Sequence, residues 1–86
     1  MNVSPAFTEA FARSKQLKER PDNETLLKLY ALYKQATSGD APDKGDYGMF
    51  DFKEKFKHEA WLKLKAMNSE EAQQQYIDLV ATLENQ

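Results

Sequence analysis

The stretch Tyr30-Ala-Leu-Tyr-Lys-Gln-Ala-Thr-Ser-Gly-Asp40 decides how the centre of this chain folds. Helical spacing of i, i+3, i+4 and i+7 puts four polar side chains on one face: Tyr30, Tyr33, Lys34 and Thr37. Gly39 follows this periodic run directly and is well placed to end the helix. The face carries tyrosine rings and an ammonium group, where a soluble helix usually presents either apolar core residues or solvated charge.

A second stretch, Gly48-Met-Phe-Asp-Phe-Lys-Glu-Lys-Phe-Lys57, has a related character. Lys53 and Lys57 lie one helical turn apart, with Phe56 and the pair Ala60-Trp61 beside them. Aromatic rings interleaved with ammonium groups suit a flat base and a phosphate. The two stretches therefore predict a nucleotide-like ligand. The alternative is ordinary packing, in which the tyrosines are half-buried and the lysine stems cover apolar surface.

The periodicity predicts four helices and no strand of useful length. Ser4 would cap the first helix with Pro5 at its first position, and the helical spacing continues through Leu17 until Pro21 ends the element. Asp22 or Asn23 would cap the second helix, which runs from about Glu24 to Ser38.

The third predicted helix begins near Asp51, whose carboxylate can cap it, and continues to about Lys65. Asn68, with Glu71 three residues later, resembles a capping box for a fourth helix. The short connections at 20–23 and 66–68 favour antiparallel neighbours. The long loop at 39–49 leaves helices two and three free to run either parallel or antiparallel. The fold class is thus an all-α four-helix bundle.

Length and composition restrict the function. A chain of 86 residues predicts a single domain, residues 1–86. The formal net charge of −2 argues against nucleic-acid binding. All twelve Lys and Arg residues lie between Arg13 and Lys65, while residues 68–86 carry acidic side chains and no base. A local basic cluster on an acidic chain suits a small polyanionic ligand.

The sequence has few residues suited to catalysis or to metal binding. No cysteine is present, and His58 alone cannot build a metal site. No Ser-His-Asp or paired-carboxylate arrangement stands out, so we expect neither an enzyme nor a cofactor. We expect His58 to form a surface i, i+4 pair with Glu54. Residues 1–20 hold no long apolar run, which predicts neither a secretion signal nor a membrane span, and hence a cytoplasmic location.

The separate blocks together resemble a known family. The chain is similar to the acyl-CoA-binding protein family from about Phe7 to Leu83. The similarity is carried by Tyr30-x-x-Tyr-Lys-Gln-Ala-Thr-x-Gly-Asp40, Gly48-Met-x-Asp-Phe-Lys53, Lys57, Ala60-Trp61 and Tyr76-Ile77. The resemblance implies a four-helix bundle of up-down-down-up topology. It also implies a monomeric, non-catalytic carrier of medium- to long-chain acyl-CoA thioesters, without stable membrane insertion.

The resemblance also implies roles for single residues. Tyr30, Lys34 and Lys57 would engage the 3′-phosphate of the CoA ribose. Tyr33 and Tyr76 would stand beside the adenine and pantetheine portions, and Lys15 would approach the phosphates. The acyl chain would be lined by Phe7, Phe11 and Leu27.

Three positions depart from the family pattern. Phe11 stands where members tend to carry a small alanine, so it would shorten or redirect the acyl groove. His58 replaces an aromatic residue, commonly Trp, and Tyr47 replaces a common proline.

Two other functions remain as rivals. In an interaction module, the same aromatic face would bind a partner helix and CoA esters would have no effect. In an enzyme acting on acyl-CoA, such as a thioesterase, a nucleophile would be needed, and none is evident. A covalent acyl carrier is disfavoured because no serine is flanked by Asp and Leu.

Overall fold

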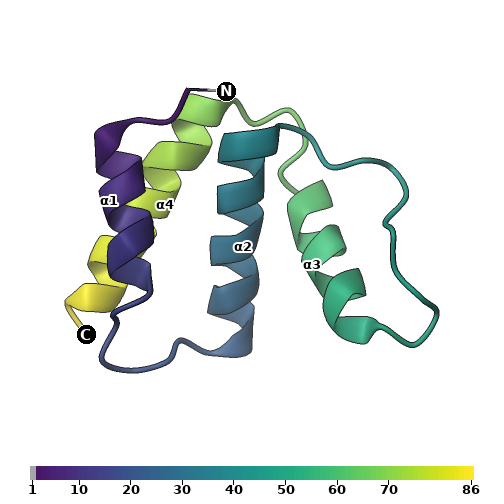
Figure 1. Ribbon diagram of the computed structural model, residues 1–86, viewed down its shortest axis with the longest axis horizontal. Coiled ribbons are helices and arrows are strands. Elements are labelled where there is room, and N and C mark those ends of the chain that lie inside the picture. Colours follow the sequence, from purple (N-terminus) through teal and green to yellow (C-terminus); the bar gives the residue numbers. More distant parts are fainter. Residues whose placement is uncertain (1) are drawn as a thin grey trace.

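The computed structural model describes residues 2–86, which form four helices and no strand (Figure 1). The helices are α1 (Pro5–Ser14), α2 (Asn23–Ser38), α3 (Phe52–Leu62) and α4 (Ser69–Glu84). The predicted all-α class is therefore confirmed.

Each helix begins at a side chain that the sequence marked as a cap. The Ser4 hydroxyl accepts a hydrogen bond from the Phe7 N–H at 3.1 Å, and the Asn68 side chain accepts from the Glu71 N–H at 2.8 Å. Asp22, rather than Asn23, caps α2 by accepting from the Thr25 N–H at 2.8 Å, and Asp51 caps α3 in the same way. These bonds satisfy N–H groups that have no partner within the helix.

The first helix ends earlier than predicted, at Ser14 instead of continuing through Leu17. The N–H groups of Lys15 and Gln16 bond to carbonyl groups three residues back, so the backbone tightens into turns. The Ser14 hydroxyl meanwhile donates to the Phe11 carbonyl at 2.6 Å. Periodicity missed this end because no glycine or proline marks it.

The third helix also ends early, at Leu62 instead of Lys65. Three-residue turns follow it, and Ala66 adopts a left-handed conformation with φ of 74°. The Ala66 N–H donates to Asp40 at 2.8 Å, which holds this residue in a conformation that usually favours glycine. A contact from a distant part of the chain thus fixes the turn that follows α3.

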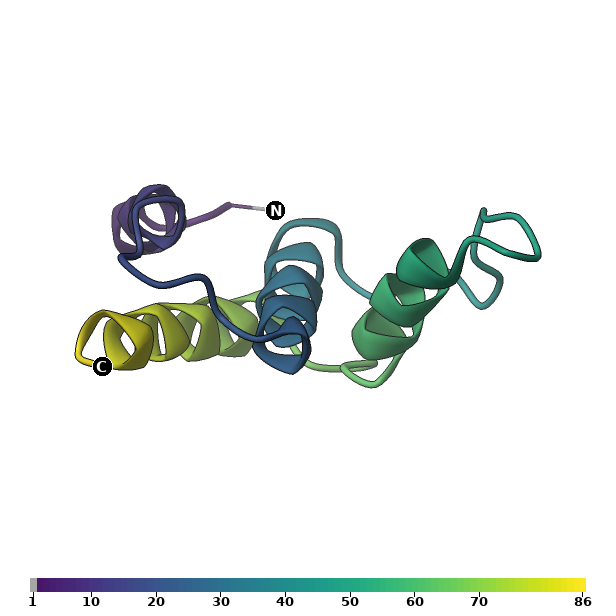
Figure 2. The same cartoon turned by 90° about the horizontal axis from the view of Figure 1, so that it is seen from below.

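The helix directions settle the open question of topology. Figure 1 shows α1 and α4 running one way and α2 and α3 the other, so α2 and α3 are parallel. This is the expected up-down-down-up order. Helix α4 contacts α1 and α2, whereas α3 contacts α2 alone. In Figure 2, α1 lies over α4 on one side of α2, and α3 stands by itself on the other side.

The core lies where α1, α2 and α4 meet. Its buried members are Phe7, Ala10, Leu29, Leu32, Ala36, Ala72, Tyr76 and Val80. No residue of α3 belongs to this set, and the one buried residue of α3 is His58. Helix α3 is therefore held on the bundle by one flank, with a groove between it and α2.

Candidate functional site

Helix α2 positions the central members of the predicted site. Tyr30 faces α3, where the Lys57 ammonium lies 4.5 Å from the centroid of its ring. This is the geometry of a cation–π contact. Lys57 Nζ also lies 3.4 Å from a carboxylate oxygen of Glu54, one turn earlier on α3. The Tyr30–Lys57 pair bridges the two helices.

Lys34 makes a second contact of the same kind, one turn further along α2. Its ammonium lies 4.9 Å from the centroid of the Trp61 ring on α3. Trp61 is fixed in turn, because its indole N–H donates to the Gly39 carbonyl at 2.8 Å. Tyr30, Lys34 and Lys57 thus form an aromatic and cationic strip along the line where α2 faces α3.

A groove of about 610 Å³ lies beside this strip, between α2 and α3. Three of the predicted site residues line it: Leu27, Tyr30 and Lys57. Five further lining residues were not among the predicted ones: Arg20, Asn23, Leu26, Lys53 and Phe56. Helical spacing could have predicted two of them, because Lys53 and Phe56 share a face of α3 with Lys57. Arg20 comes from the loop before α2, where periodicity gives no guidance.

Four aromatic residues gather on the opposite flank of α2. Tyr33 stacks on Phe11 at 4.8 Å and on Phe7 at 5.9 Å between ring centroids. Tyr76 of α4 lies 5.1 Å from Phe7 and 6.4 Å from Tyr33. Phe7 and Tyr76 are almost fully buried, whereas Tyr33 and Phe11 are partly exposed.

Burial has a chemical consequence for Tyr76. Loss of hydration raises the pKa of its phenol above the ordinary 10.0, against the opposing effect of the hydrogen bond with Ser14. The phenol oxygen lies 3.1 Å from the Ser14 hydroxyl oxygen, within hydrogen-bond distance. Tyr76 therefore stays neutral at physiological pH and offers polarity only through its hydroxyl group.

Lys15 lies at the end of α1 and completes this flank. Its ammonium is 4.8 Å from the centroid of the Phe11 ring. Lys15 itself is exposed. The Phe11 ring thus contacts both a cation and the Tyr33 ring, at the edge of the core.

The structure divides the predicted residues into two groups that share α2. One group lies where α2 and α3 meet: Leu27, Tyr30 and Lys34 of α2 with Lys57 of α3. The other group lies on the α1 and α4 side of α2: Phe7, Phe11, Lys15, Tyr33 and Tyr76. The three residues predicted to line the acyl chain are therefore not contiguous: Leu27 is in the α2–α3 groove, and Phe7 and Phe11 contact Tyr33.

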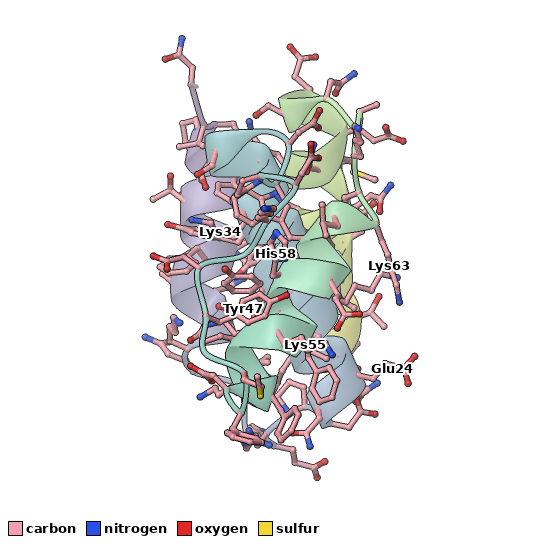
Figure 3. The ribbon with its side chains drawn as sticks, turned by 90° about the vertical axis from the view of Figure 1, so that its right-hand side faces the viewer. Glu24, Lys34, Tyr47, Lys55, His58 and Lys63 are labelled. Carbon is pink, nitrogen blue, oxygen red and sulfur yellow. The ribbon has the colours of Figure 1, made fainter. Side chains whose placement is uncertain are left out.

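The expectation for His58 is wrong. His58 is buried and forms no pair with Glu54, which contacts Lys57 instead. Its Nε2 donates to the Pro42 carbonyl at 2.6 Å, and its ring lies 5.8 Å from that of Tyr47 (Figure 3). The long loop folds back over this face of α3 and covers the imidazole. Sequence spacing within one helix could not reveal a partner sixteen residues away.

Three further features of the described chain lie outside the candidate site. A second hollow, of about 420 Å³, lies near the end of α1 and the C-terminus and holds none of the predicted residues. Within residues 2–86, no group of three or more His, Cys, Asp or Glu side chains is arranged to hold a metal ion. None of the described helices is both long and apolar enough to cross a membrane.

Comparison with known proteins agrees with the geometry. Residues 4–80 match the model of the family described as Acyl CoA binding protein. The chain is 46% identical over 81 residues to the acyl-CoA-binding protein of Saccharomyces cerevisiae, covering 94% of this chain and 92% of the relative. An acyl-CoA-binding protein homolog of Drosophila melanogaster is 47% identical over 81 residues, covering 94% of this chain and 93% of the relative.

Solved structures give the same result. The crystal structure of Oryza sativa acyl-CoA-binding protein 2 superposes with a TM-score of 0.83 at 38% identity, covering 93% of this chain and 88% of the other. The chain also matches enoyl-CoA delta isomerase 2 of Rattus norvegicus at 47% identity, but it spans only 19% of that enzyme.

Proposed function

The chain belongs to the acyl-CoA-binding protein family, and from this premise we propose that it is a carrier that reversibly binds medium- to long-chain acyl-CoA without transforming it. In this proposal residues 1–86 are one acyl-CoA-binding domain, acting as a monomer in the cytoplasm. The thioester and the acyl chain of the ligand would be shielded from water while the nucleotide is held by tyrosine and lysine side chains.

One observation carries the proposal: a cationic and aromatic strip runs directly beside a partly apolar groove. The strip is Tyr30, Lys34 and Lys57, and the apolar side chains of the groove are Leu26, Leu27 and Phe56. An anionic nucleotide joined to an alkyl chain has the same division into two parts. The neighbouring position of strip and groove therefore supports an amphiphilic ligand over a purely polar one.

We assign the head group to the strip and to its neighbours on the other flank of α2. Lys34 and Lys57 would release their aromatic and carboxylate contacts and donate to the 3′-phosphate, together with the Tyr30 hydroxyl. Tyr33, Tyr76 and Lys15 would contact the remaining adenine, pantetheine and phosphate groups. Each hydrogen bond between a charged donor and phosphate is worth roughly 1.5–3 kcal/mol.

We assign at least the first part of the acyl chain to the α2–α3 groove, with Leu27 as one wall. Burial contributes about 0.8 kcal/mol per methylene before ordering costs. Phe7 and Phe11 remain proposed acyl contacts on the other flank of α2. The preferred acyl-chain length then depends on how far the acyl chain extends beyond Phe56.

Calorimetric titration with a sixteen-carbon acyl-CoA tests this function, with free CoA and palmitate as controls below their aggregation limits. We expect one-to-one binding of the thioester, much tighter than binding of either control. Trp61 is the single tryptophan and contacts Lys34, so its fluorescence should change in the same titration. Absence of thioester binding would reject the carrier and favour an interaction module. Hydrolysis of the thioester during incubation would instead favour an enzyme.

A further inference from the structure

The single histidine of the chain, His58, is buried beneath the loop that joins α2 to α3, and only 7% of it is exposed. Its Nε2 bonds to the Pro42 carbonyl at 2.6 Å, and the Tyr47 ring is tilted by 56° against the imidazole (Figure 3). A carbonyl oxygen can only accept a hydrogen bond, so Nε2 must carry the hydrogen. In the neutral ring the other nitrogen, Nδ1, therefore carries none.

The Nδ1 side of the ring is closed by the loop backbone. Nδ1 is buried and has no hydrogen-bond partner among residues 2–86. A Cβ atom at Gly45 would lie 2.9 Å from Nδ1 and would collide with the Tyr47 ring, so the loop packs here more closely than a residue with a side chain allows. A nitrogen without a hydrogen tolerates this enclosure far better than a charged N–H group does, because burial of an unpaired charge costs much more.

The side chains around the ring do not balance a positive charge on it. Within the described part of the chain, His58 forms no ion pair, and Glu54, one turn earlier on α3, is engaged by Lys57. Lys34 of α2 contacts the Trp61 ring, one turn after His58, and so adds positive charge on this side. No hydrogen bond joins the imidazole to the other ionisable side chains of these elements, among them Tyr30 of α2, Lys55 and Glu59 of α3, and Asp40, Asp43, Lys44, Asp46 and Tyr47 of the loop.

We propose that the contact between His58 and the loop is a pH-sensitive switch, closed while the imidazole is neutral and opened when the ring is protonated. A proton on Nδ1 creates a buried cation whose N–H has no acceptor, so the loop must move away to let water reach it. The open state then binds the proton more readily than the closed state. Lowering the pH through the range in which an exposed histidine titrates, around pH 6.5, raises the open population by up to about tenfold over two pH units.

Opening of the loop should loosen α3 and the groove beside it. Among the helices, α3 contacts α2 alone, and the loop leads directly into its first turn. Besides the bond of His58, the Trp61 indole ties α3 to the Gly39 carbonyl at the other end of the loop. Because α3 supplies one wall of the α2–α3 groove, acyl-CoA should be held less tightly in mild acid. Only this last step rests on the proposed carrier function.

Nuclear magnetic resonance of the ligand-free chain, titrated from about pH 7.5 to about pH 5.5, tests the switch. Because His58 is the single histidine, the shifts of its ring nitrogens report the tautomer and the protonation without ambiguity. We expect the Nε2–H tautomer at the start, and the amide signals of Gly45 and Tyr47 should move in the same transition as the ring. A ring that titrates while these two signals stay unchanged would overturn the proposal.

His58→Gln is the matched control, because its amide can still donate to the Pro42 carbonyl but does not titrate in this range. The Gly45 and Tyr47 signals of this variant should not change with pH, and the same transition as in the unmodified chain would overturn the switch. Gly45→Ala is a second test that leaves His58 in place. Its methyl group displaces the Tyr47 ring, so His58 should titrate at a higher pH than in the unmodified chain, and equal titration would also contradict the proposal.

Calorimetric titration with a sixteen-carbon acyl-CoA at both pH values tests the effect on the ligand. The 3′-phosphate of CoA titrates in the same range, so the quantity that matters is the fall in affinity relative to His58→Gln. We expect the fall to be several-fold larger in the unmodified chain. An equal fall, with the loop transition present, would overturn the coupling between loop and groove. Absence of thioester binding at about pH 7.5 would overturn the carrier function and leave the switch in place.

Discussion

At the scale of single residues, Lys57 is a candidate binding group that already contacts a ring and a carboxylate. Its side chain is only 25% exposed, its ammonium lies over the Tyr30 ring, and its stem lines the α2–α3 groove. A lysine held in this way loses less conformational freedom on binding than a free surface lysine. The Lys57 ammonium group is therefore well placed to bind an anionic ligand.

Replacing Lys57 by Met should weaken acyl-CoA binding strongly. Methionine retains most of the apolar stem but removes the charged donor, worth roughly 1.5–3 kcal/mol, or about 10- to 150-fold in Kd. Calorimetric titration measures the change, with Lys63→Met as a control of the same chemistry outside the groove. If Lys57→Met and the unmodified chain bind equally well, Lys57 does not contact the phosphate.

Replacing Glu54 by Gln should act in the opposite direction. Glu54 holds the Lys57 ammonium at 3.4 Å, so a phosphate must displace it. Because Glu54 is exposed, the pair is worth at most about 1 kcal/mol, and the expected gain in affinity is a few-fold. The same titration at low salt measures it, and a decrease would mean that Glu54 helps to position Lys57 for the ligand.

Asp40 should make stability depend on pH in acid. Hydrogen bonds from the Ala66 N–H and the Gln35 side chain, with a smaller effect of Lys65, lower the pKa of its carboxyl below the ordinary 3.8. A lowered folded-state pKa means that the unfolded chain binds more protons in this range. The contribution of the ionised Asp40 to the stability of the fold is then fully present above pH 3.8. It is lost as the pH falls through the lowered pKa of the folded state.

The Asp40→Asn variant tests this linkage. At pH 7 we expect it to be less stable than the unmodified chain in urea unfolding, because the amide accepts the same hydrogen bonds without charge. The difference should shrink as the pH falls below 3.8. A difference that stays constant across this range would mean that ionisation of Asp40 does not contribute.

At the scale of elements, α3 is the helix least tied to the core. Among the helices it contacts α2 alone, and its one buried residue is His58, while α2 is packed between α3 and α4. Its position relies on cross-chain hydrogen bonds such as those of His58 with Pro42 and Trp61 with Gly39. Elements with few buried contacts open at lower free energy than the rest of a domain.

Hydrogen exchange should therefore be faster in α3 than in α2 or α4. Bound acyl-CoA would contact both sides of the α2–α3 groove, so we expect it to slow exchange in α3 more than in α4. Amide exchange followed with and without ligand measures both effects. Equal protection of α3 and α2 in the free chain would contradict the first expectation. Unchanged exchange in α3 on binding would mean that the ligand does not occupy the α2–α3 groove.

At the scale of the whole molecule, the fold is a thin slab of 37 × 28 × 16 Å, and its core and its groove lie in different parts of the slab. The core lies where α1, α2 and α4 meet, and the groove lies between α2 and α3. Acidic side chains without any base occupy residues 68–86, so the basic groups are left to the rest of the molecule. The ligand face can therefore be cationic on a chain of net negative charge.

Ligand binding should stabilise the whole fold. A ligand that binds the folded chain alone, at about 100 times its Kd, adds about 2.7 kcal/mol, or on the order of 10–20 °C in Tm for a domain of this size. Thermal unfolding followed by circular dichroism measures the shift for a sixteen-carbon acyl-CoA, with free CoA at the same concentration as the control. A shift as large with CoA as with the thioester would mean that the acyl chain contributes nothing.

The local sequence was enough to predict the four helices and the side chains at which they begin. Side chains such as Ser4, Asp22, Asp51 and Asn68 act on N–H groups two or three residues away, so their effect can be read locally. Apolar side chains at helical spacing within one helix, such as Leu29 and Leu32 of α2, are likewise buried on a common face.

The folded structure was needed to show where α1 and α3 end, which group His58 contacts and how the candidate site residues are divided between two flanks of α2. Ala66 bonds to Asp40, and His58 bonds to Pro42, across many intervening residues. The spacing that put Tyr30 and Tyr33 on one face could not separate the flank facing α3 from the flank facing α1 and α4. These features depend on which distant segments meet, and the free energy of such contacts is set by packing rather than by local spacing.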